Sequence, residues 1–215
     1  MKVLITGTSK GIGKAIAEKF LSSGHEVIGM DILPSHIQNA HYLHIQTDVY
    51  SGDLPDISGV EILINNAGVQ DSGKDIEINL KGGIRITEKY AFQDKIKSVL
   101  FIASSSARTG AEFPEYAASK GGLVAYMKNV ALRIAKYGAT SNSLSPGGVK
   151  TELNERVMKD GRLWEQIMNE TLLPKWAEAE EIAEWAYFVT VVNKSMTAQD
   201  ILIDNGEDAK ANFIW

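Results

Sequence analysis

Two side chains near the middle of the chain have the types and the spacing needed to move a proton. Tyr116 and Lys120 lie four residues apart, so on a helix both project from the same face. A free tyrosine has a pKa of about 10, which is too high for acid–base work at neutral pH. A neighbouring lysine charge favours the tyrosinate and lowers that pKa. The pair suits general acid–base chemistry, although the same spacing often occurs by chance in a core tyrosine with an exposed lysine.

A glycine-rich turn near the start of the chain has the features of a phosphate-binding site. Residues 6–13 read Thr-Gly-Thr-Ser-Lys-Gly-Ile-Gly, between a short apolar run and an amphipathic stretch. Gly7, Gly11 and Gly13 permit positive φ and close approach of another group. The start of a following helix offers free N–H groups and partial positive charge. This strand–turn–helix order predicts a cradle for a pyrophosphate; the alternative is a tight turn without a ligand.

An acidic residue follows at the spacing that a dinucleotide site requires. Asp31 ends the second apolar run, 20 residues after Gly11. In dinucleotide-binding units an acidic side chain at this place accepts hydrogen bonds from the adenosine ribose. An exposed aspartate at a strand end is commonplace, but its spacing from the glycines favours the cofactor role.

These residues must be positioned by alternating strands and helices. The apolar runs predict buried parallel strands at Lys2–Thr6, Glu26–Met30, Tyr42–Gln46, Glu61–Ile64, Ser98–Ala103, Thr140–Leu144 and Gln199–Ile203. Longer amphipathic stretches predict helices at Ile12–Ser22, Ile76–Lys95, Tyr116–Tyr137 and Glu180–Val192. Residues 48–60 and 69–75 read as loops. The alternation implies a doubly wound α/β sheet, and residues 1–215 are expected to form a single domain.

The composition excludes several classes of function. The net charge of −5 gives no excess of Lys and Arg for nucleic acid. The chain has no cysteine, so disulfides, thiolate metal sites and cysteine nucleophiles are excluded. The first apolar run is too short for a signal peptide or a membrane span. The four histidines all precede residue 45 without metal-ligand spacing. We therefore expect a cytoplasmic protein that binds neither metal, nucleic acid nor membrane.

Several further motifs, in order along the chain, resemble the short-chain dehydrogenase/reductase family of the classical type. The glycines have that family's spacing, and the remaining matches are Asn65-Asn66-Ala67-Gly68, Asn79, Tyr116-Ala117-Ala118-Ser119-Lys120, Pro146-Gly147 with Thr151, and Asp204-Asn205-Gly206. The resemblance implies a Rossmann-type, mainly seven-stranded parallel sheet with helices on both faces. It also implies hydride transfer between a nicotinamide cofactor and a small-molecule carbonyl or alcohol, and a homodimer or homotetramer.

The resemblance assigns catalytic roles to four residues. Tyr116 is the acid/base, Lys120 lowers its pKa, and Asn79 holds a water that links the lysine to solvent. A serine after the fifth strand holds the substrate oxygen. Alignment of the apolar run favours Ser104, but its distance to Tyr116 is one residue short of the common spacing, so Ser105 remains an alternative.

The same resemblance assigns the cofactor contacts. They are Gly7, Gly11, Ile12, Gly13, Asp31, Asp48, Val49, Asn66, Tyr116, Lys120, Val149 and Thr151. Asp31 favours NAD(H), because its carboxylate accepts bonds from ribose hydroxyls and repels a phosphate. Lys10 lies where relatives that prefer NADP(H) often carry a basic residue, so NADP(H) remains possible.

The chain also departs from the family. It is shorter at the two predicted loops, and Asn205 and Ala198 replace family glycines. Residues 152–176 are expected to form a substrate lid, whose apolar side chains either pack on the core or face a moderately apolar substrate. Apolar residues on several faces of the helices at 76–95 and 116–137, with the apolar tail at 213–215, favour an oligomer. The competing function is a non-catalytic dinucleotide-sensing regulator, which would have no need of a proton relay.

Overall fold

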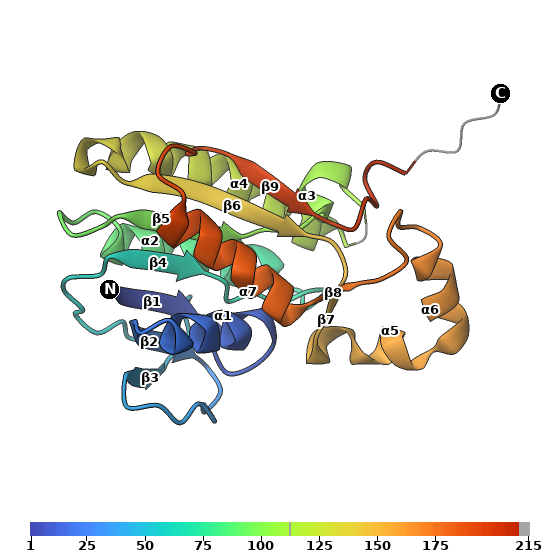
Figure 1. The fold of residues 1–215 in the computed structure, drawn as a ribbon, viewed down its shortest axis with the longest axis horizontal. Helices are drawn as coiled ribbons and strands as arrows, with labels where there is room; N and C mark the ends of the chain where they lie inside the picture. The colour runs from blue at the N-terminus through green and yellow to red at the C-terminus, as the bar shows by residue number, and fades with distance from the viewer. Residues whose placement is uncertain (112, 211–215) are drawn as a thin grey trace.

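The computed structural model describes residues 1–111 and 113–210, and their framework is one parallel sheet (Figure 1). Within these residues seven strands pair in the order β3-β2-β1-β4-β5-β6-β9. The strands are β1 (Lys2–Thr6), β2 (Glu26–Asp31), β3 (Tyr42–Gln46), β4 (Ile62–Asn65), β5 (Ser98–Ile102), β6 (Thr140–Pro146) and β9 (Asp200–Ile203). The central strands β4 and β5 are buried along their whole length, as apolar runs without alternation predict.

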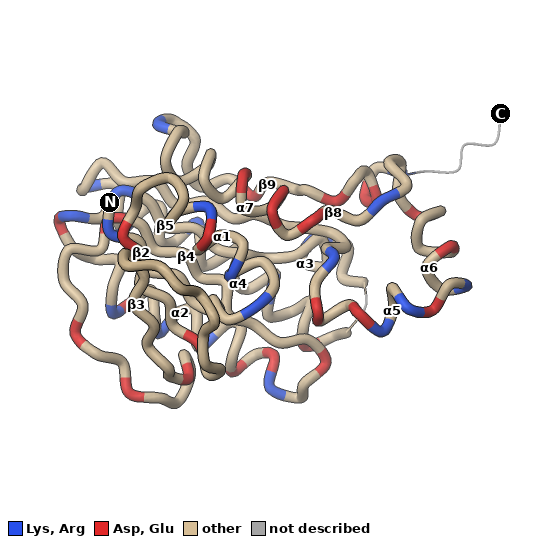
Figure 2. The backbone as a smooth tube through the Cα atoms, turned by 60° about the horizontal axis from the view of Figure 1, so that its bottom comes forward, with Lys and Arg blue, Asp and Glu red and all other residues tan. Residues whose placement is uncertain are grey.

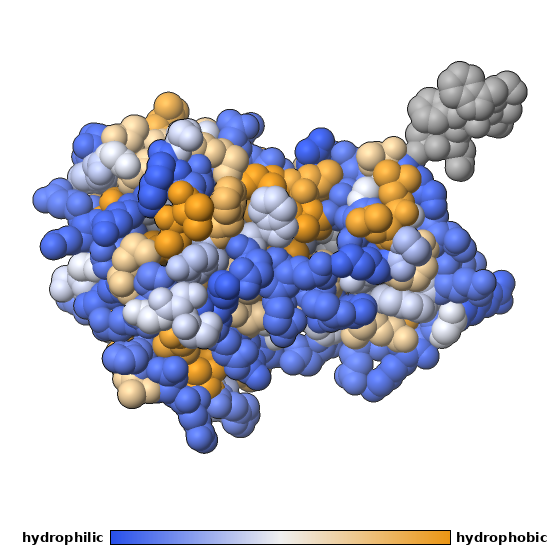
Figure 3. Space-filling model, viewed as in Figure 1, coloured by the Kyte–Doolittle hydropathy of each residue, from blue (hydrophilic) through white to orange (hydrophobic). Residues whose placement is uncertain are grey.

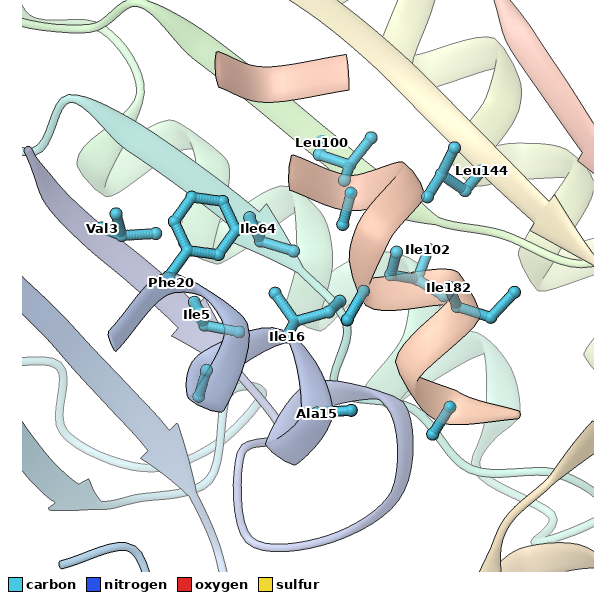
Figure 4. Close-up of a cluster of buried hydrophobic side chains, with 14 of the residues drawn as sticks. Val3, Ile5, Ala15, Ile16, Phe20, Ile64, Leu100, Ile102, Leu144 and Ile182 are labelled. Atoms are coloured by element: carbon cyan, nitrogen blue, oxygen red, sulfur yellow. The ribbon is translucent and has the colours of Figure 1, made fainter. Parts of the chain in front are cut away.

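Helices cover both faces of the sheet (Figure 1). One face carries α1 (Gly11–Ser22) and α7 (Ala179–Tyr187), and the other carries α2 (Gly83–Tyr90) and α4 (Pro114–Ile134). Figure 4 shows Ile16 and Phe20 of α1 and Ile182 of α7 gathered over Ile5 and Ile64 of the sheet. The Rossmann-type, doubly wound sheet expected from the sequence is therefore confirmed.

The strand order reverses between β1 and β4, so the connections after these two strands leave in opposite directions. In open α/β sheets a ligand binds at such a reversal, beyond the carboxyl ends of the strands. The glycine turn follows β1 there, and the Gly7 amide donates to the Met30 carbonyl of β2 at 2.6 Å. The fold thus places the predicted pyrophosphate cradle at the switch point.

Two connections on one side of the sheet have no helix. Residues 32–41 join β2 to β3, and residues 47–61 join β3 to β4, without a regular element in either described segment. The second connection is held by α2, because Arg85 donates to the carbonyls of Val49 and Gly52 at 3.1 and 2.7 Å. The loop predicted at 48–60 lies within it.

Some helix boundaries differ from the sequence prediction. The helix predicted to run to Lys95 ends at Tyr90, because the Gln93 side chain donates to the Tyr90 carbonyl in place of the next helical turn. Its first part, η1 (Ile76–Gly82), is a π-helix. The helix predicted from Tyr116 begins at Pro114, a residue type that suits the first helical position. Ala198 and Asn205, which replace family glycines, keep left-handed backbone with φ of 59° and 56°.

The segment after β6 leaves the sheet and returns to it. It contains β7 (Val149–Lys150), η3 (Glu152–Asn154), α5 (Glu155–Lys159), α6 (Gly161–Met168) and β8 (Ala177–Glu178). β7 and β8, which are not predicted from the sequence, pair in parallel and close the excursion. None of residues 152–170, all of them described, is buried, so the apolar side chains of α6 do not pack on the core.

Charges of both signs are distributed along the described backbone (Figure 2). Among the described residues no helix is long and apolar enough to cross a membrane, and no group of His, Asp and Glu is placed to hold a metal ion. Apolar side chains reach the surface in patches on the face shown in Figure 3.

Candidate active site

A cavity of about 580 Å³ opens at the carboxyl ends of the strands. It is bounded by the glycine turn, the ends of β2, β4, β5 and β6, the start of α4 and the segment after β7. Of the predicted site residues it is lined by Gly7, Gly11, Ile12, Asp31, Asp48, Val49, Asn66, Ser104, Tyr116, Lys120, Val149 and Thr151. Gly13 and Asn79 lie outside its lining.

The glycine turn depends on its three glycines for different reasons. Gly7 and Gly11 have φ of 76° and 55°, a region that other residues rarely adopt. Gly13 has ordinary φ, but a Cβ there would collide with the Gly7 carbonyl and the Asn66 side chain. Gly13 therefore lets α1 approach the end of β1, and it shapes the turn without facing the cavity.

Asn66 braces this turn from the neighbouring strand. Its side-chain amide donates to the carbonyls of Thr6 and Gly7 at 3.0 and 3.1 Å. In return, the Thr6 hydroxyl accepts bonds from the backbone amides of Asn66 and Ala67, both at 3.0 Å. The segment after β4 is thus tied to the turn after β1 at the point where the strand order reverses.

The carboxylate of Asp31 is fixed at the end of β2. Its Oδ2 accepts from the Ser9 amide and its Oδ1 from the Leu33 amide, both at 2.9 Å. The side chain is buried at 8% exposure but lines the cavity. Lys10 lines the same end of the cavity as an exposed residue. A rigid carboxylate and a flexible ammonium group therefore share this end.

Three further predicted residues border the cavity. Asp48 accepts bonds from the Tyr50 amide and the Ser51 hydroxyl, both at 2.8 Å, which fixes the turn that carries Val49. Thr151 lies against the glycine turn, since a Cβ on Gly11 would be 3.5 Å from its Cγ2. The start of the segment after β7 is thereby brought beside the predicted phosphate cradle.

Lys120 is buried beneath Tyr116 on α4. Its Nζ lies 5.6 Å from the centre of the Tyr116 ring and donates to the Ile102 carbonyl at 2.9 Å. Burial lowers the pKa of Lys120 to about 8, and the carboxylate of Asp75 opposes that shift. The ammonium group retains donors for a further partner, because lysine has three.

Two of the three serines after β5 line the cavity. Ser104 and Ser105 both reach it, whereas Ser106 does not. The Ser104 hydroxyl donates to the Ser106 hydroxyl at 3.1 Å and accepts from the Ser106 amide at 3.2 Å. Ser106 therefore helps to orient Ser104, a contact that the sequence analysis missed.

Asn79 lies near Lys120 but does not line the cavity. Its Oδ1 accepts from the Val69 amide at 2.7 Å, and its Nδ2 donates to the Val69 carbonyl and the Ser119 hydroxyl at 2.9 and 3.0 Å. A Cβ on Gly68 would be 3.0 Å from Asn79 Oδ1 and 3.4 Å from Lys120 Nζ. The asparagine side chain thus holds the segment after β4 against the lysine.

These residues fit a nicotinamide dinucleotide. Gly11, Asp31, Tyr116 and Lys120 line one cavity, so the groups expected to meet the pyrophosphate, the ribose and the nicotinamide are brought together. The chemistry of this cavity suits a ligand with a pyrophosphate in the middle and a reactive ring beside a proton donor.

Comparisons with known proteins agree with this arrangement. The family model of short chain dehydrogenases matches residues 1–162. The chain is 28% identical to a 3-oxoacyl-acyl-carrier-protein reductase of Buchnera aphidicola over 233 aligned positions, which cover 94% of each protein. It is 26% identical to a solved 4-hydroxyisoleucine dehydrogenase mutant in complex with NADH and succinate, with a TM-score of 0.87 and coverage of 99% and 100%.

A structure from Agrobacterium tumefaciens with bound NADP shares the fold at 24% identity, with a TM-score of 0.86 and coverage of 97% of this chain and 96% of that one. The family model alone spans three quarters of the sequence, and the glycine turn and the Tyr116–Lys120 pair fall inside it. The chain belongs to the short chain dehydrogenase family, and it is an NAD(P)-dependent oxidoreductase that transfers a hydride between the cofactor and a carbonyl or secondary alcohol.

Proposed function

We propose that the enzyme prefers NAD(H) and that Tyr116 exchanges the proton with the substrate oxygen. The observation that carries the catalytic assignment is the position of Lys120, whose buried ammonium group is anchored to Ile102 and lies beneath the Tyr116 ring. A positive charge held there favours the tyrosinate. Ser104 is proposed to hold the substrate oxygen, with Ser105 as the alternative, and Asn79 to support Lys120.

The proton chemistry follows from this placement. Nicotinamide, when bound, supplies or accepts the hydride. In the direction of reduction the Tyr116 hydroxyl gives its proton to the substrate oxygen, and the charge of Lys120 stabilises the tyrosinate that remains. In the direction of oxidation the tyrosinate takes the hydroxyl proton back. Burial keeps water from screening the lysine charge, which strengthens its effect on the tyrosine.

We infer NAD(H) preference from the ribose end of the cavity. The two amide bonds from Ser9 and Leu33 fix the Asp31 carboxylate while leaving further lone pairs for hydroxyl donors. A phosphate on the ribose would meet the same carboxylate as a like charge. Lys10 opposes this effect only weakly, because its exposed side chain remains solvated.

The substrate is proposed to be a small carbonyl or alcohol with an apolar portion. The lid segment at 152–176 contributes Leu153, Ile167 and Trp176 to the cavity. Trp176 is buried at 8% exposure and stacks edge-on with Trp164, with ring centres 5.0 Å apart. These side chains offer an apolar wall near the proposed proton donor.

The chain is further proposed to work as one domain in the cytoplasm, as a homodimer or homotetramer. Leu132 on α4 is 79% exposed, and Trp185, Phe188 and Val192 near α7 are also exposed. Exposed apolar groups of this kind mark interfaces. The apolar tail at 213–215, which the sequence analysis also used, lies outside the described residues.

Turnover tests the catalytic proposal against the sensor alternative. Purified protein is mixed with NADH or NADPH and a panel of ketones and aldehydes, or with the oxidised cofactors and secondary alcohols. The absorbance of the reduced nicotinamide reports the reaction. Turnover with higher efficiency for NAD(H) is expected. Tight dinucleotide binding without turnover of any substrate in a broad panel would instead favour a regulator.

A further inference from the structure

The loop that carries the ribose end of the cavity lacks the support that a crossover helix would give. Parallel strands are usually joined through a helix, but residues 32–41 between β2 and β3 form none. Ile32 and Leu33 line the cavity directly after Asp31, yet they are 61% and 41% exposed. Ile37, farther along the loop, packs against the core, but the part next to Asp31 has little apolar packing to hold it against the glycine turn.

A chain of hydrogen bonds holds it instead. The Thr8 hydroxyl in the glycine turn bonds to the Tyr42 hydroxyl at 2.9 Å, and Tyr42 bonds to His44 Nδ1 at 3.2 Å. The Nε2 of His44 then bonds to the Leu33 carbonyl at 2.9 Å. Tyr42 and His44 are two residues apart on β3, so their stacked rings point to one side of the sheet.

The Leu33 carbonyl at the end of this series of hydrogen bonds determines which group donates in each bond. A carbonyl only accepts, so Nε2 of His44 carries the hydrogen that meets Leu33. In neutral imidazole the other nitrogen accepts, so the Tyr42 hydroxyl donates to His44. Tyr42 then accepts from Thr8. The chain runs in one direction, with every donor matched to an acceptor.

Two further bonds close this chain into a ring around Asp31. The Ser9 hydroxyl donates to the Leu33 carbonyl at 3.0 Å, so this oxygen receives both Ser9 and His44. The backbone amides of the same two residues, Ser9 and Leu33, hold the Asp31 carboxylate. Strand β2 leaves room for these hydrogen bonds because it carries a glycine at position 29. A Cβ on Gly29 would overlap the hydroxyls of Tyr42 and Thr8.

We propose that Tyr42 and His44 are positioning residues that set the preference for NAD(H), acting through Leu33 and Thr8 on Asp31. This inference rests on the proposed use of NAD(H) at this cavity. By joining the loop after β2 to the glycine turn, the chain keeps the Asp31 carboxylate at the ribose hydroxyls. It also prevents the loop from opening to admit a ribose phosphate.

Binding measurements without substrate test this role. Tyr42→Phe keeps the ring but breaks both bonds of the central hydroxyl. The Kd of NADH, measured by calorimetry, is expected to rise about fivefold, as the loss of one net hydrogen bond predicts. The Kd of NADPH is expected to fall rather than rise, because the loosened loop opens more readily for a ribose phosphate. Tyr137→Phe, which removes a tyrosine hydroxyl beyond the far end of α4, is the matched control and should leave both values unchanged.

A second variant and a double mutant show whether weaker NADH binding comes from the broken hydrogen bonds or from a general loss of structure. His44→Leu removes the other end of the chain from a half-buried position and is expected to reproduce the effect. Thr8→Val combined with Tyr42→Phe should weaken NADH binding little more than either change alone, because both break the same chain. In the ligand-free protein, amide hydrogen exchange at Leu33 should become faster in Tyr42→Phe, with an unchanged circular dichroism spectrum.

The outcomes separate this inference from the proposed function. If the wild type binds NADH and both Tyr42→Phe and His44→Leu bind it within twofold of the wild type, the positioning role is wrong. If the wild type binds neither dinucleotide, the proposed function fails, and the inference fails with it. A wild type that prefers NADPH would overturn the specificity role while leaving the enzyme class intact.

Discussion

The Nζ atom of Lys120 lies 5.6 Å from the centre of the Tyr116 ring while it donates a hydrogen bond to the carbonyl at the end of β5, at Ile102. This one side chain joins α4 to the sheet and places its charge under the tyrosine. The relationship does not depend on the flexible end of an exposed lysine, because the whole residue is 5% exposed. The catalytic role proposed for Tyr116 depends on this fixed position of the Lys120 ammonium group.

Tyr116→Phe is expected to lower turnover by on the order of 100-fold or more, the usual contribution of a general acid–base group. The ring and its packing remain, so the Kd of the cofactor should change less than twofold. Steady-state kinetics and calorimetry on the same preparation measure both quantities. Tyr137→Phe serves as control. Normal turnover in Tyr116→Phe would show that another group handles the proton.

The two candidate serines can be separated by single changes. Ser104→Ala is expected to lower kcat by on the order of 100-fold, because the substrate oxygen loses its hydrogen bond in the reacting state. Ser105→Ala should change kcat by less than threefold, since its backbone amide, which donates to the Pro146 carbonyl at 2.8 Å, is kept. The reverse ranking would assign the role to Ser105.

Lys120 should also affect how stability depends on pH. Its pKa in the folded protein is lowered to about 8 by burial, from 10.5. The unfolded chain therefore binds this proton more tightly, and folding carries a penalty below about pH 8 that disappears as pH rises toward 10.5. Because each pKa unit corresponds to about 1.4 kcal/mol, the penalty on the free energy of folding is roughly 3 kcal/mol.

Urea unfolding of the ligand-free protein across this range measures the effect. The free energy of unfolding of the wild type is expected to rise with pH relative to that of Lys120→Met, which lacks the titrating group. The comparison is made in the Tyr116→Phe background, because the charge of Lys120 acts on the ionisation of Tyr116. The remaining groups then titrate equally in both proteins and cancel in the difference. Parallel pH profiles for the two proteins would contradict a lowered lysine pKa.

Asp31→Ser should remove most of the preference for NAD(H). Two unit charges ~4 Å apart interact by about 4 kcal/mol at an effective dielectric near 20, and half of that still exceeds a tenfold preference. Comparing kcat/KM for NADH and NADPH in the wild type and the variant gives the result directly. Asp53→Ser, an exposed carboxylate in the neighbouring loop, is the control. A wild type that prefers NADPH would mean that Lys10 governs the site.

Light scattering should report an assembly of two or four chains, each of 23.5 kDa, at micromolar concentration. Leu132, 79% exposed on α4, is proposed to lie in the contact. Leu132→Arg is expected to shift the protein toward the monomer with its melting temperature in dilute solution little changed, because an exposed helical site tolerates the change. A monomeric wild type would refute the expectation.

The sequence predicted those features that local patterns encode. The ranges of β1 and β3 agree with the apolar runs, and Asp31 and the glycines follow from spacing along one strand–turn–helix unit. The bonds that fix these residues join segments far apart in the chain, such as Ser9 to Asp31 and Asn79 to Ser119. Such contacts have no local signature, so they cannot be predicted from the sequence alone.

Other features were not predicted because they leave no recognisable pattern in the sequence. β7 and β8 are only two residues long each, too short for any periodicity to appear. The Thr8–Tyr42–His44 chain uses residue types that occur anywhere in soluble proteins, and only their approach across the sheet gives them a role. Asn79 is predicted on a helix, but neither the π geometry of that helix nor the hydrogen bond from Asn79 to the Val69 carbonyl has a local sequence signature.

That π-helix has a consequence for how the gene of this enzyme can change in length. A π turn holds one residue more than an α turn, and η1 runs directly into α2. Deletion of a single codon within it would be absorbed by a return to α geometry, which leaves the residues before and after the turn on their faces of the helix. A one-codon change in the regular α2 has no such reserve and would rotate the residues on one side of it by about 100° about the helix axis.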